Sequence, residues 1–429
     1  MRSDSATQRE RGKMSDAVTS APVVENDDPI ICQIDGEKCH AIHIYIKKKH
    51  PDWTIERYKR EFPEAPLLSE KAKRRVAESR AQQAAMAEAT GVKTARVARQ
   101  AIFHEVFELG NAKAALSSVG KPIAIEVFDE YPEALKEFMP EIDRNYVFNI
   151  DLTRKVLMGM RLNKPTYLFG FHGTGKTTVF EQVCARTGRP FIRVQHTGNT
   201  EESHVLGQYV VRSKMVSHEV MAPDGSRQTI QTPMSVTEFQ LGPLPLAMLE
   251  GAVYCADEYD FAMPQVVALY QPVLEGKALI IKDAPPEFRM IKPHPQFRMV
   301  ATGNTNGTGD ETGLYQGTLI QNAANFSRFP ITEEVHYMEP KIEEAVISSQ
   351  TGIDRADAAK FVKVAKEVRE QFRDGKISMT VSPRELINAA ANGLVLGCNW
   401  AEGLRLAFTN RCPRVDKKVI EEFAQRIFG

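Results

Sequence analysis

The stretch Gly170–Thr178, GFHGTGKTT, lies between the apolar run Thr166–Phe169 and the helix-like segment Val179–Val183. It matches the pattern G-x-x-x-x-G-K-[ST] at every fixed position, in the strand–loop–helix context that this pattern requires. Glycines at these spacings permit positive φ and remove side-chain bulk, so that backbone N–H groups can wrap a triphosphate. The predicted nucleotide-binding residues are Gly170, His172, Gly173, Thr174, Gly175, Lys176, Thr177 and Thr178.

The end of this loop and the end of a later strand predict the chemistry of ATP hydrolysis. Lys176 is placed to reach the β- and γ-phosphates, and the Thr177 hydroxyl to bind Mg²⁺. The apolar run Gly251–Glu258 ends in two acids, which is typical of a buried parallel strand whose carboxyl end faces a ligand. Asp257 is therefore the predicted Mg²⁺-binding carboxylate, and Glu258 the base that polarises water. An acidic pair that simply begins a loop is the alternative.

Three more polar residues are candidates for the catalytic machinery. Asn304 lies near the end of the strand-like run 297–305, where an amide can orient water beside the γ-phosphate without adding charge. Arg328 follows a helical stretch and suits a finger that completes a neighbouring subunit's ATP site. Arg384 begins a helix, from which it can reach over the nucleotide. A surface arginine at a helix start is the alternative for Arg384.

Composition bounds the class of protein. The chain has 429 residues, of which 42% are hydrophobic, and is long enough for two or three domains. Its 55 basic and 55 acidic residues cancel, so overall charge favours neither nucleic acid nor a membrane surface as a partner. The six cysteines show no framework spacing, which indicates reduced thiols. With no secretory signal pattern and no long apolar stretch, we expect a cytoplasmic protein without a membrane anchor.

Changes of pattern along the chain predict five parts. Residues 1–28 are polar without periodicity and are expected to be disordered. Residues 29–70 form a small, mainly helical module, and 71–144 a helical linker region. An α/β core with a parallel sheet is predicted for 145–335. Apolar residues at three- and four-residue spacing predict a helical lid for 336–429.

Two alternating stretches within the core predict β-hairpins. The first covers 208–232 and turns at Pro223–Gly225. The second covers 278–291 and turns at Ala284–Pro286. The predicted core therefore carries insertions in addition to its nucleotide-binding sheet.

The small N-terminal module contains a candidate zinc site. It resembles the Ros/MucR type of zinc-finger region, in which a Cys-x-x-Cys or Cys-x-x-Asp pair precedes a helix with two histidines. Cys32, Asp35 and His50 match that pattern. Tyr45 stands where the third ligand is expected, so His43 or His40 would have to substitute for it. A structural zinc site needs four well-placed ligands. We therefore favour a small helical module with exposed histidines over one that binds zinc.

The core and lid resemble the MoxR and chelatase group of AAA+ ATPases over roughly residues 145–429. Besides the GFHGTGKTT loop, the segments that carry the likeness are ADEYD at 256–260, KPHPQFRMVATGNTNGTGDETGLYQGT at 292–318, SPR at 382–384 and the closing LAFTNRC…EEFAQRIFG. The His-Pro-x-Phe-Arg and Gly-Leu-Tyr-x-Gly-Thr runs are specific to the CobS-like branch of the group. The resemblance implies an AAA+ core with the β-hairpin insertions of the chelatases.

The resemblance also implies a working cycle and partners. It implies an ATP- and Mg²⁺-dependent motor that assembles with copies of itself into a ring, typically a hexamer. It implies that Arg328 is the arginine finger and Arg384 the sensor-2 arginine. In the CobS-like branch the motor works with a von Willebrand A-type partner and a large chelatase subunit, and ATP turnover drives Co²⁺ insertion into a corrin ring.

Differences from the CobS-like pattern leave other functions open. Gly303 replaces an expected alanine, Phe326–Phe329 replaces Met-Asp-Arg-Trp, and the N-terminal region is longer. Similar motors are also carried by bacteriophages, so a remodeller from a phage or mobile element is one alternative. A second is a nucleic-acid-binding regulator in which residues 30–70 recognise DNA and the ATPase acts as a switch. A third is a nucleotide-binding scaffold without hydrolysis, against which Glu258 and Arg328 argue.

Overall fold

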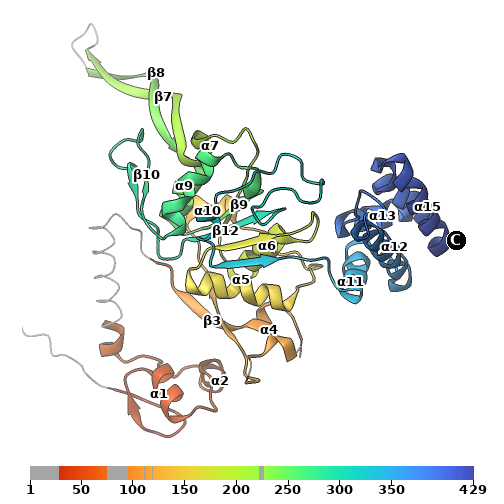
Figure 1. The fold of residues 1–429 in the computed structure, drawn as a ribbon. Helices are drawn as coiled ribbons and strands as arrows, with labels where there is room; N and C mark the ends of the chain where they lie inside the picture. Colours follow the sequence, from red (N-terminus) through yellow and green to blue (C-terminus); the bar gives the residue numbers. More distant parts are fainter. Residues whose placement is uncertain (1–28, 75–94, 111–112, 118, 222–226) are drawn as a thin grey trace, which may run out of the picture. The chain divides into compact units, whose positions relative to one another are not determined.

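The computed structural model divides into two compact units, Met1–Thr90 and Gly91–Gly429 (Figure 1). The residues that it describes are 29–74, 95–110, 113–117, 119–221 and 227–429. The segment predicted to be disordered, 1–28, lies outside the described residues, as do most of the helix-forming start of the predicted linker and the turn Pro223–Gly225. Among the described residues, no helix is both long and apolar enough to cross a lipid bilayer.

The described part of the first unit begins with two short strands, which are followed by two helices. Strands β1 (Ile30–Ile31) and β2 (Lys38–Cys39) pair antiparallel, and helices α1 (Ile42–Lys49) and α2 (Ile55–Glu61) follow. Helix α2 begins after Thr54, whose side chain accepts a hydrogen bond from a backbone N–H of the first turn. The fully or nearly buried apolar residues of this unit are Cys32, Cys39, Ile42, Ile46 and Tyr58.

A five-stranded parallel sheet forms the centre of the second unit, as the sequence predicts. In spatial order its strands are β13 (Ile331–Glu334), β5 (Thr166–Phe169), β12 (Arg298–Gly303), β9 (Val253–Asp257) and β6 (Phe191–Gln195). The central strands β9 and β12 are buried along their whole length. Because a parallel sheet is covered on both faces, such strands are continuously apolar rather than alternating.

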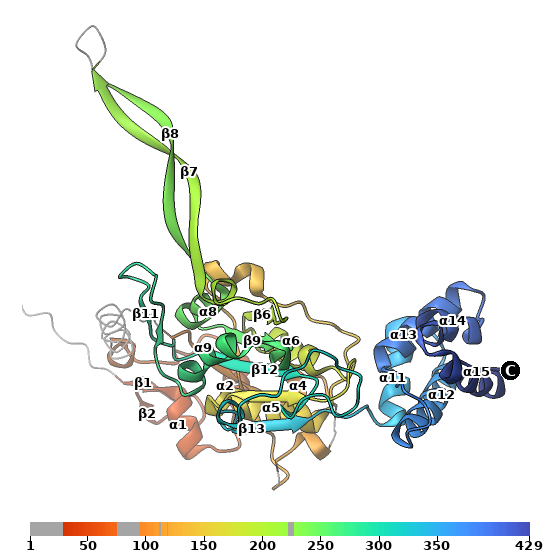
Figure 2. The ribbon, with the colours of Figure 1, turned by 45° about the horizontal axis from the view of Figure 1, so that its top comes forward.

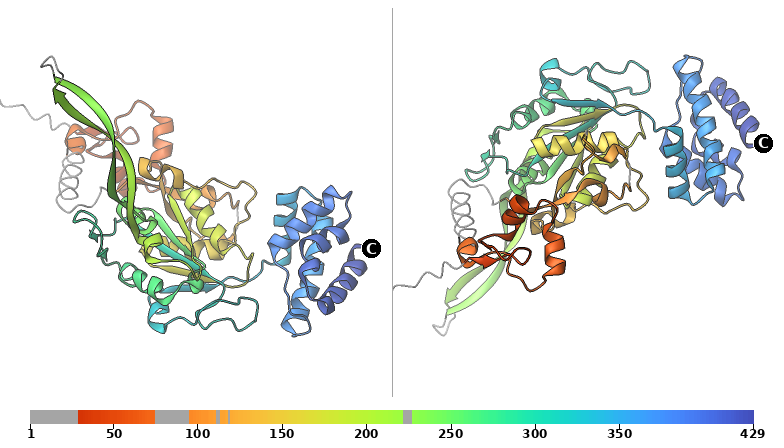
Figure 3. Two further views of the ribbon diagram at one scale, coloured as in Figure 1. Left: turned by 90° about the horizontal axis from the view of Figure 1, so that it is seen from above. Right: turned by 90° about the horizontal axis from the view of Figure 1, so that it is seen from below.

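Helices cover both faces of this sheet (Figure 3). Tyr254 and Cys255 are neighbours on β9 and point to opposite faces, so each belongs to a different apolar cluster. Tyr254 packs in the cluster that contains α8 (Pro243–Glu250) and α9 (Pro264–Leu274). Cys255 packs in the cluster that contains α5 (Ile150–Leu162) and α6 (Lys176–Thr187).

The region before the core differs from the predicted helical linker. Strands β3 (Ala98–Ile102) and β4 (Ala124–Phe128) form an antiparallel pair there. From residue 95 to the start of α5, the helical pieces among the described residues are all short: α4 (Phe103–Val106) and 3₁₀ helices at Lys113–Ala115 and Glu133–Phe138. The helical prediction was wrong for this stretch because Ile125 and Val127, on either side of Glu126, point to the same face of β4 and pack onto the cluster of α5 and α6.

Both predicted β-hairpins are confirmed. Strands β7 (Gly207–Met221) and β8 (Arg227–Leu241) pair along their whole length and extend far beyond the sheet and its helices (Figure 2). They follow the short helix α7 (Glu202–Leu206). The second hairpin is much shorter and pairs β10 (Leu279–Ile280) with β11 (Met290–Ile291).

The C-terminal part is helical, as predicted for the lid. Before it, a 3₁₀ helix at Tyr259–Phe261 follows β9, and the short helix α10 (Ala323–Phe326) precedes β13. The lid consists of α11 (Pro340–Thr351), α12 (Arg355–Arg373), α13 (Pro383–Val395), α14 (Trp400–Ala407), a 3₁₀ helix at Thr409–Arg411 and α15 (Arg414–Phe428). Its apolar positions form a cluster of their own, which is distinct from the two clusters on the sheet.

Candidate nucleotide site

The loop between β5 and α6 has the backbone geometry that phosphate binding requires. Gly173 and Gly175 adopt φ of 71° and 84°, in the left-handed region that disfavours residues with a Cβ. A Cβ atom at Gly173 would lie 2.7 Å from the Cβ of Ser382 in the lid. Helix α6 begins immediately after Gly175, so its first free N–H groups face the loop. The loop can therefore wrap an anion closely with backbone donors.

Lys176 is the buried cation of the loop. Its Nζ donates to the carbonyl oxygens of Gly170 at 2.8 Å and Phe171 at 2.9 Å, and lies 3.3 Å from Asn304 Oδ1. Burial lowers the pKa of Lys176 to about 8, although the charge of Glu258 opposes this shift. The ammonium group is thus still protonated at neutral pH and is held over the loop, where a β- or γ-phosphate would replace its carbonyl partners.

Thr177 in the first turn of α6 lies beside Asp257, the last residue of β9. The Thr177 hydroxyl donates to Asp257 Oδ1 at 2.7 Å, and Thr302 donates to the same oxygen. The side chain of Asp257 is almost completely buried. A hydroxyl and a carboxylate are the hard oxygen ligands that Mg²⁺ prefers, so the residues present fit this ion.

Arg193 was not identified from the sequence. It lies on β6, and its Nε donates to Asp257 Oδ2 at 2.7 Å while Nη2 lies 2.5 Å from the same oxygen. The sequence did offer a signal for Arg193. A charged residue stands in the middle of the apolar strand β6, which pairs with β9. Strand pairing brings the two residues together, because Gln195 on β6 is in register with Asp257 on β9.

Glu258 and Asn304 form a hydrogen-bonded pair beside Thr177 and Asp257. Glu258 has φ of 55°, which is unusual for a residue with a side chain and is typical of strained functional positions. Asn304 Nδ2 donates to Glu258 Oε2 at 2.6 Å. Burial, together with the charges of Asp260 and Asp257, raises the pKa of Glu258 above its ordinary value. A carboxylate of raised pKa is a better proton acceptor, which is what activation of water needs.

Asp260 is a second residue that the sequence did not single out. It is fully buried, and its Oδ2 accepts hydrogen bonds from the backbone N–H groups of Asn304 at 2.8 Å and Thr305 at 2.9 Å. The Thr305 hydroxyl donates to the same oxygen at 3.0 Å. This carboxylate therefore fixes the backbone that carries Asn304. Its place in the quoted segment ADEYD, two residues after Glu258, was the available signal.

These groups surround a pocket of about 230 Å³ on the loop. Its lining residues are His172, Gly173, Gly175, Lys176, Thr177, Thr178, Glu181, Arg193, Gln195, Asp257, Glu258, Thr302, Asn304 and Arg384. A second pocket of about 390 Å³ adjoins the loop at Thr174 and Gly175, and segments 146–152 and 333–339 line it. Its apolar and aromatic walls suit a base and ribose, whereas the first pocket suits phosphates.

The lid contacts the loop through His172. The backbone N–H of His172 donates to the hydroxyl of Tyr315 in the core at 2.9 Å. On the lid side, the Nε2 atom of His172 lies 3.6 Å from Glu385 Oε2. Burial acts to raise the pKa of Glu385, but hydrogen bonds from His172 and Ser382 outweigh it and hold that pKa below its ordinary value. The start of α13 is thus positioned over the loop, and Arg384 in its first turn reaches the phosphate pocket.

Arg328 does not line either pocket of its own chain. Its Nε donates to Glu275 Oε1 at 2.7 Å, and Nη1 donates to the Ala324 carbonyl at 2.5 Å. Its role as a finger in a neighbouring site stays a prediction.

In the first unit, three of the four candidate zinc ligands lie together. The ligand atoms of Cys32, Asp35 and His50 all lie within 4.8 Å of one another. His43 is exposed on α1 and is not in this group, so its assignment as a ligand was wrong. The Tyr45 hydroxyl instead donates to Asp35 Oδ2 at 2.8 Å, and His50 Nε2 lies 2.7 Å from the same oxygen. Tyr45, which stands where the resemblance expects the third metal ligand, is thus part of a hydrogen-bonded cluster around the Asp35 carboxylate.

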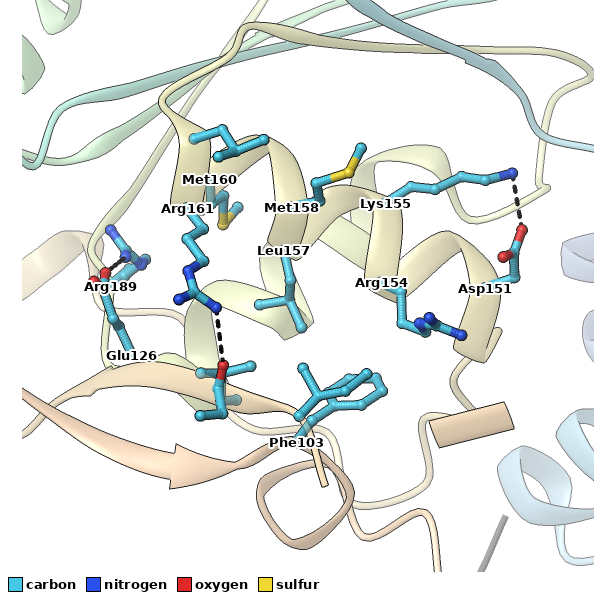
Figure 4. Close-up of a pocket in the computed structure, with 14 residues that line it drawn as sticks. Phe103, Glu126, Asp151, Arg154, Lys155, Leu157, Met158, Met160, Arg161 and Arg189 are labelled. Carbon is cyan, nitrogen blue, oxygen red and sulfur yellow. Dashed lines mark hydrogen bonds and ion pairs between the residues drawn. The ribbon is translucent and has the colours of Figure 1, made fainter. Parts of the chain in front are cut away.

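A cavity of about 630 Å³ lies away from this chemistry, between α5 and the β3–β4 pair (Figure 4). Phe103 and Leu157 are part of its apolar lining, and Lys155 pairs with Asp151 at 2.8 Å at one end. It shares no lining residue with the phosphate pocket. Cavity volume therefore does not identify the nucleotide site in this structure.

The phosphate-binding loop follows β5, and the acidic pair Asp257 and Glu258 follows β9, with β12 between these two strands. A loop and an acidic pair at the same edge of a parallel sheet define an ATP-hydrolysing enzyme of the AAA+ class. Comparison with known families agrees with this class. The AAA domain (dynein-related subfamily) matches residues 165–316, and the CbbQ/NirQ/NorQ C-terminal domain matches residues 343–410.

Three relatives indicate the family of AAA+ ATPases to which the chain is similar. Aerobic cobaltochelatase subunit CobS from Sinorhizobium sp is 34% identical over 299 residues, which are 68% of this chain and 83% of that protein. Gas vesicle ATPase GvpN from Ancylobacter aquaticus is 30% identical over 51% of this chain and 58% of its own. Protein NorQ from Paracoccus denitrificans is 24% identical over 62% of this chain and 87% of its own. The chain belongs to the MoxR-like family of AAA+ ATPases that includes CobS.

Proposed function

We propose that this protein is a ring-forming, Mg²⁺-dependent ATPase that uses ATP hydrolysis to remodel a partner protein. The observation that carries the proposal is the meeting of Lys176, Thr177, Asp257, Glu258 and Asn304 around one loop-lined pocket. These residues come from three different chain segments, and their side chains supply groups to bind phosphate, to bind Mg²⁺ and to activate water.

Each group has a distinct role in this proposal. Backbone N–H groups of the loop and Lys176 hold the β- and γ-phosphates, and Arg384 adds a positive charge from the lid. Thr177 and Asp257 would hold Mg²⁺, which when bound neutralises phosphate charge. Glu258 accepts a proton from the attacking water, and the Asn304 amide keeps that carboxylate oriented toward the γ-phosphate.

The ring is supported by the position of Arg328. Its guanidinium lies outside both pockets of its own chain, whereas an arginine finger has to reach a developing phosphate charge. A neighbouring copy offers such a charge if subunits are arranged head to tail, which is the arrangement that closes into a ring. The Glu275 carboxylate that holds Arg328 would release it when a neighbour's ATP competes for the guanidinium.

The long hairpin of β7 and β8 is the proposed remodelling element. Tyr209, Val211, Met215 and Met234 are all exposed large apolar side chains on it. An isolated two-stranded ribbon is only marginally stable in water, so contact with another protein would stabilise it. Movement of the core during hydrolysis would be transmitted to that contact.

Cobalt insertion into a corrin ring is the specific assignment that the CobS likeness favours. The relative is named as a cobaltochelatase subunit, and the alignment covers 83% of it. In this assignment the partners are a von Willebrand A-type protein and a large chelatase subunit. The likeness to gas vesicle and NorQ proteins supports the broader alternative of a remodeller unrelated to cobalamin.

Steady-state ATPase activity with Mg²⁺, together with the mass of the protein with and without ATP, tests the general proposal. The wild type should assemble with nucleotide and hydrolyse it, and Glu258→Gln should bind ATP yet turn over at least about tenfold slower, or about 1.4 kcal/mol in barrier height. Equal rates for wild type and Glu258→Gln would overturn the proposal. Addition of purified candidate chelatase subunits with Co²⁺ and a corrin then tests the specific assignment.

A further inference from the structure

The Asp257 carboxylate, which is the proposed Mg²⁺ ligand, has a cationic partner in this structure. Arg193 contacts Asp257 Oδ2 through both Nε and Nη2, at 2.7 and 2.5 Å. The other oxygen, Oδ1, accepts from the hydroxyls of Thr177 and Thr302. All of the contacts that this carboxylate makes are thus charge-assisted or hydroxyl hydrogen bonds, and both of its oxygens are engaged.

The exposure of the two partners differs greatly. The side chain of Asp257 is 3% exposed, whereas that of Arg193 is 50% exposed. The carboxylate is therefore held rigidly by its surroundings, while the guanidinium lies at the mouth of the phosphate pocket and is free to rotate away. An ion pair with one exposed partner is weak enough to be replaced when a stronger cation arrives.

We propose that Arg193 is a positioning residue that competes with Mg²⁺ for Asp257 and so sets the Mg²⁺ concentration at which the site becomes loaded. This inference rests on the proposed role of Asp257 in Mg²⁺ binding. Before nucleotide binds, the guanidinium compensates the buried charge of Asp257 and holds its carboxylate in place. Loading of the site requires that the guanidinium leave Oδ2, where its charge would also repel a divalent cation.

Competition and a merely structural role predict opposite changes in the Mg²⁺ concentration that the Arg193→Gln variant needs. If Arg193→Gln only disordered Asp257, the site would need more Mg²⁺. If Arg193 competes, the same variant needs less, by roughly two- to fivefold for the loss of a half-exposed ion pair. Arg193→Lys keeps the charge with a single donor group and should remain within about twofold of the wild type.

The test measures binding as well as turnover. Full-length protein is titrated with Mg²⁺ at saturating ATP for activity, and separately with Mn²⁺ by electron paramagnetic resonance in the presence of ADP. Arg154→Gln, on α5 and outside the lining of the phosphate pocket, is the matched control and should leave both curves unchanged. A lower half-saturating concentration in both assays for Arg193→Gln supports the proposal, and an unchanged or higher one overturns it.

Asp257→Asn separates failure of this inference from failure of the proposed function. If that variant binds Mn²⁺ as the wild type does, the metal role of Asp257 is wrong and the proposed function fails with it. If Asp257→Asn loses the metal while Arg193→Gln does not shift the curve, only the competition is refuted.

Discussion

Replacement of Asp260 by alanine should impair hydrolysis without impairing nucleotide binding. Asp260 Oδ2 accepts three hydrogen bonds, two from backbone N–H groups and one from a hydroxyl, and they fix the backbone of Asn304 and Thr305. Asn304 in turn orients Glu258 through a 2.6 Å hydrogen bond. The phosphate-binding side chains Lys176 and Thr177 do not contact Asp260 in the hydrogen bonds that the structure describes.

The magnitude follows from the contacts. A hydrogen bond to a charged group contributes about 1.5–3 kcal/mol, and about 1.4 kcal/mol corresponds to a tenfold change in rate. If the transition state loses stabilisation equal to one such hydrogen bond, kcat falls roughly 10- to 150-fold. Asp260→Asn keeps an oxygen that can accept from the same donors, so its loss should be smaller.

The assay is steady-state ATPase activity, with affinity for a fluorescent ADP analogue as the check on folding and binding. A double-mutant cycle with Asn304→Ala shows whether Asp260 acts through Asn304, because the double variant should then be no slower than the worse single one. The reasoning is refuted if Asp260→Ala keeps kcat within about twofold of the wild type while the protein is folded, or if the two losses are additive.

Three more predictions concern separate parts of the enzyme. Glu258, whose pKa is raised by burial and nearby carboxylates, must be ionised to act as base, so kcat should fall as pH decreases through this raised pKa. A kcat that does not decrease as the pH is lowered to the ordinary pKa of a glutamate side chain would contradict this. Arg328→Ala should abolish most hydrolysis, and mixing it with Glu258→Gln subunits should restore activity, which only a finger acting on a neighbour explains. Glu343→Ala removes the fully buried partner of Arg369, at 2.7 and 2.8 Å, and should destabilise the lid by about 3–5 kcal/mol in urea unfolding. Glu367→Ala, which breaks an exposed pair, is the control and should cost less than about 1 kcal/mol.

Local pattern was enough to identify the fold class and the nucleotide-binding loop. The loop, the acidic end of β9 and the two hairpins are each specified by residues close in sequence, since strand ends, tight turns and helix starts have local chemical requirements. The linker prediction failed for the opposite reason. Strands β3 and β4 pair because the cluster on α5 and α6 offers an apolar surface, and local helix-forming tendency does not record that surface.

The sequence by itself therefore determined which groups come together at the site: a phosphate-binding loop and an acidic pair at a predictable strand end. Only the tertiary structure decided the partners of those groups. Arg193 reaches Asp257 because β6 is in register beside β9, and Asp260 holds Asn304 because the turn after β9 folds back under β12. The physical reason is that hydrogen bonds and charge pairs depend on distance in space, whereas a motif records only distance along the chain.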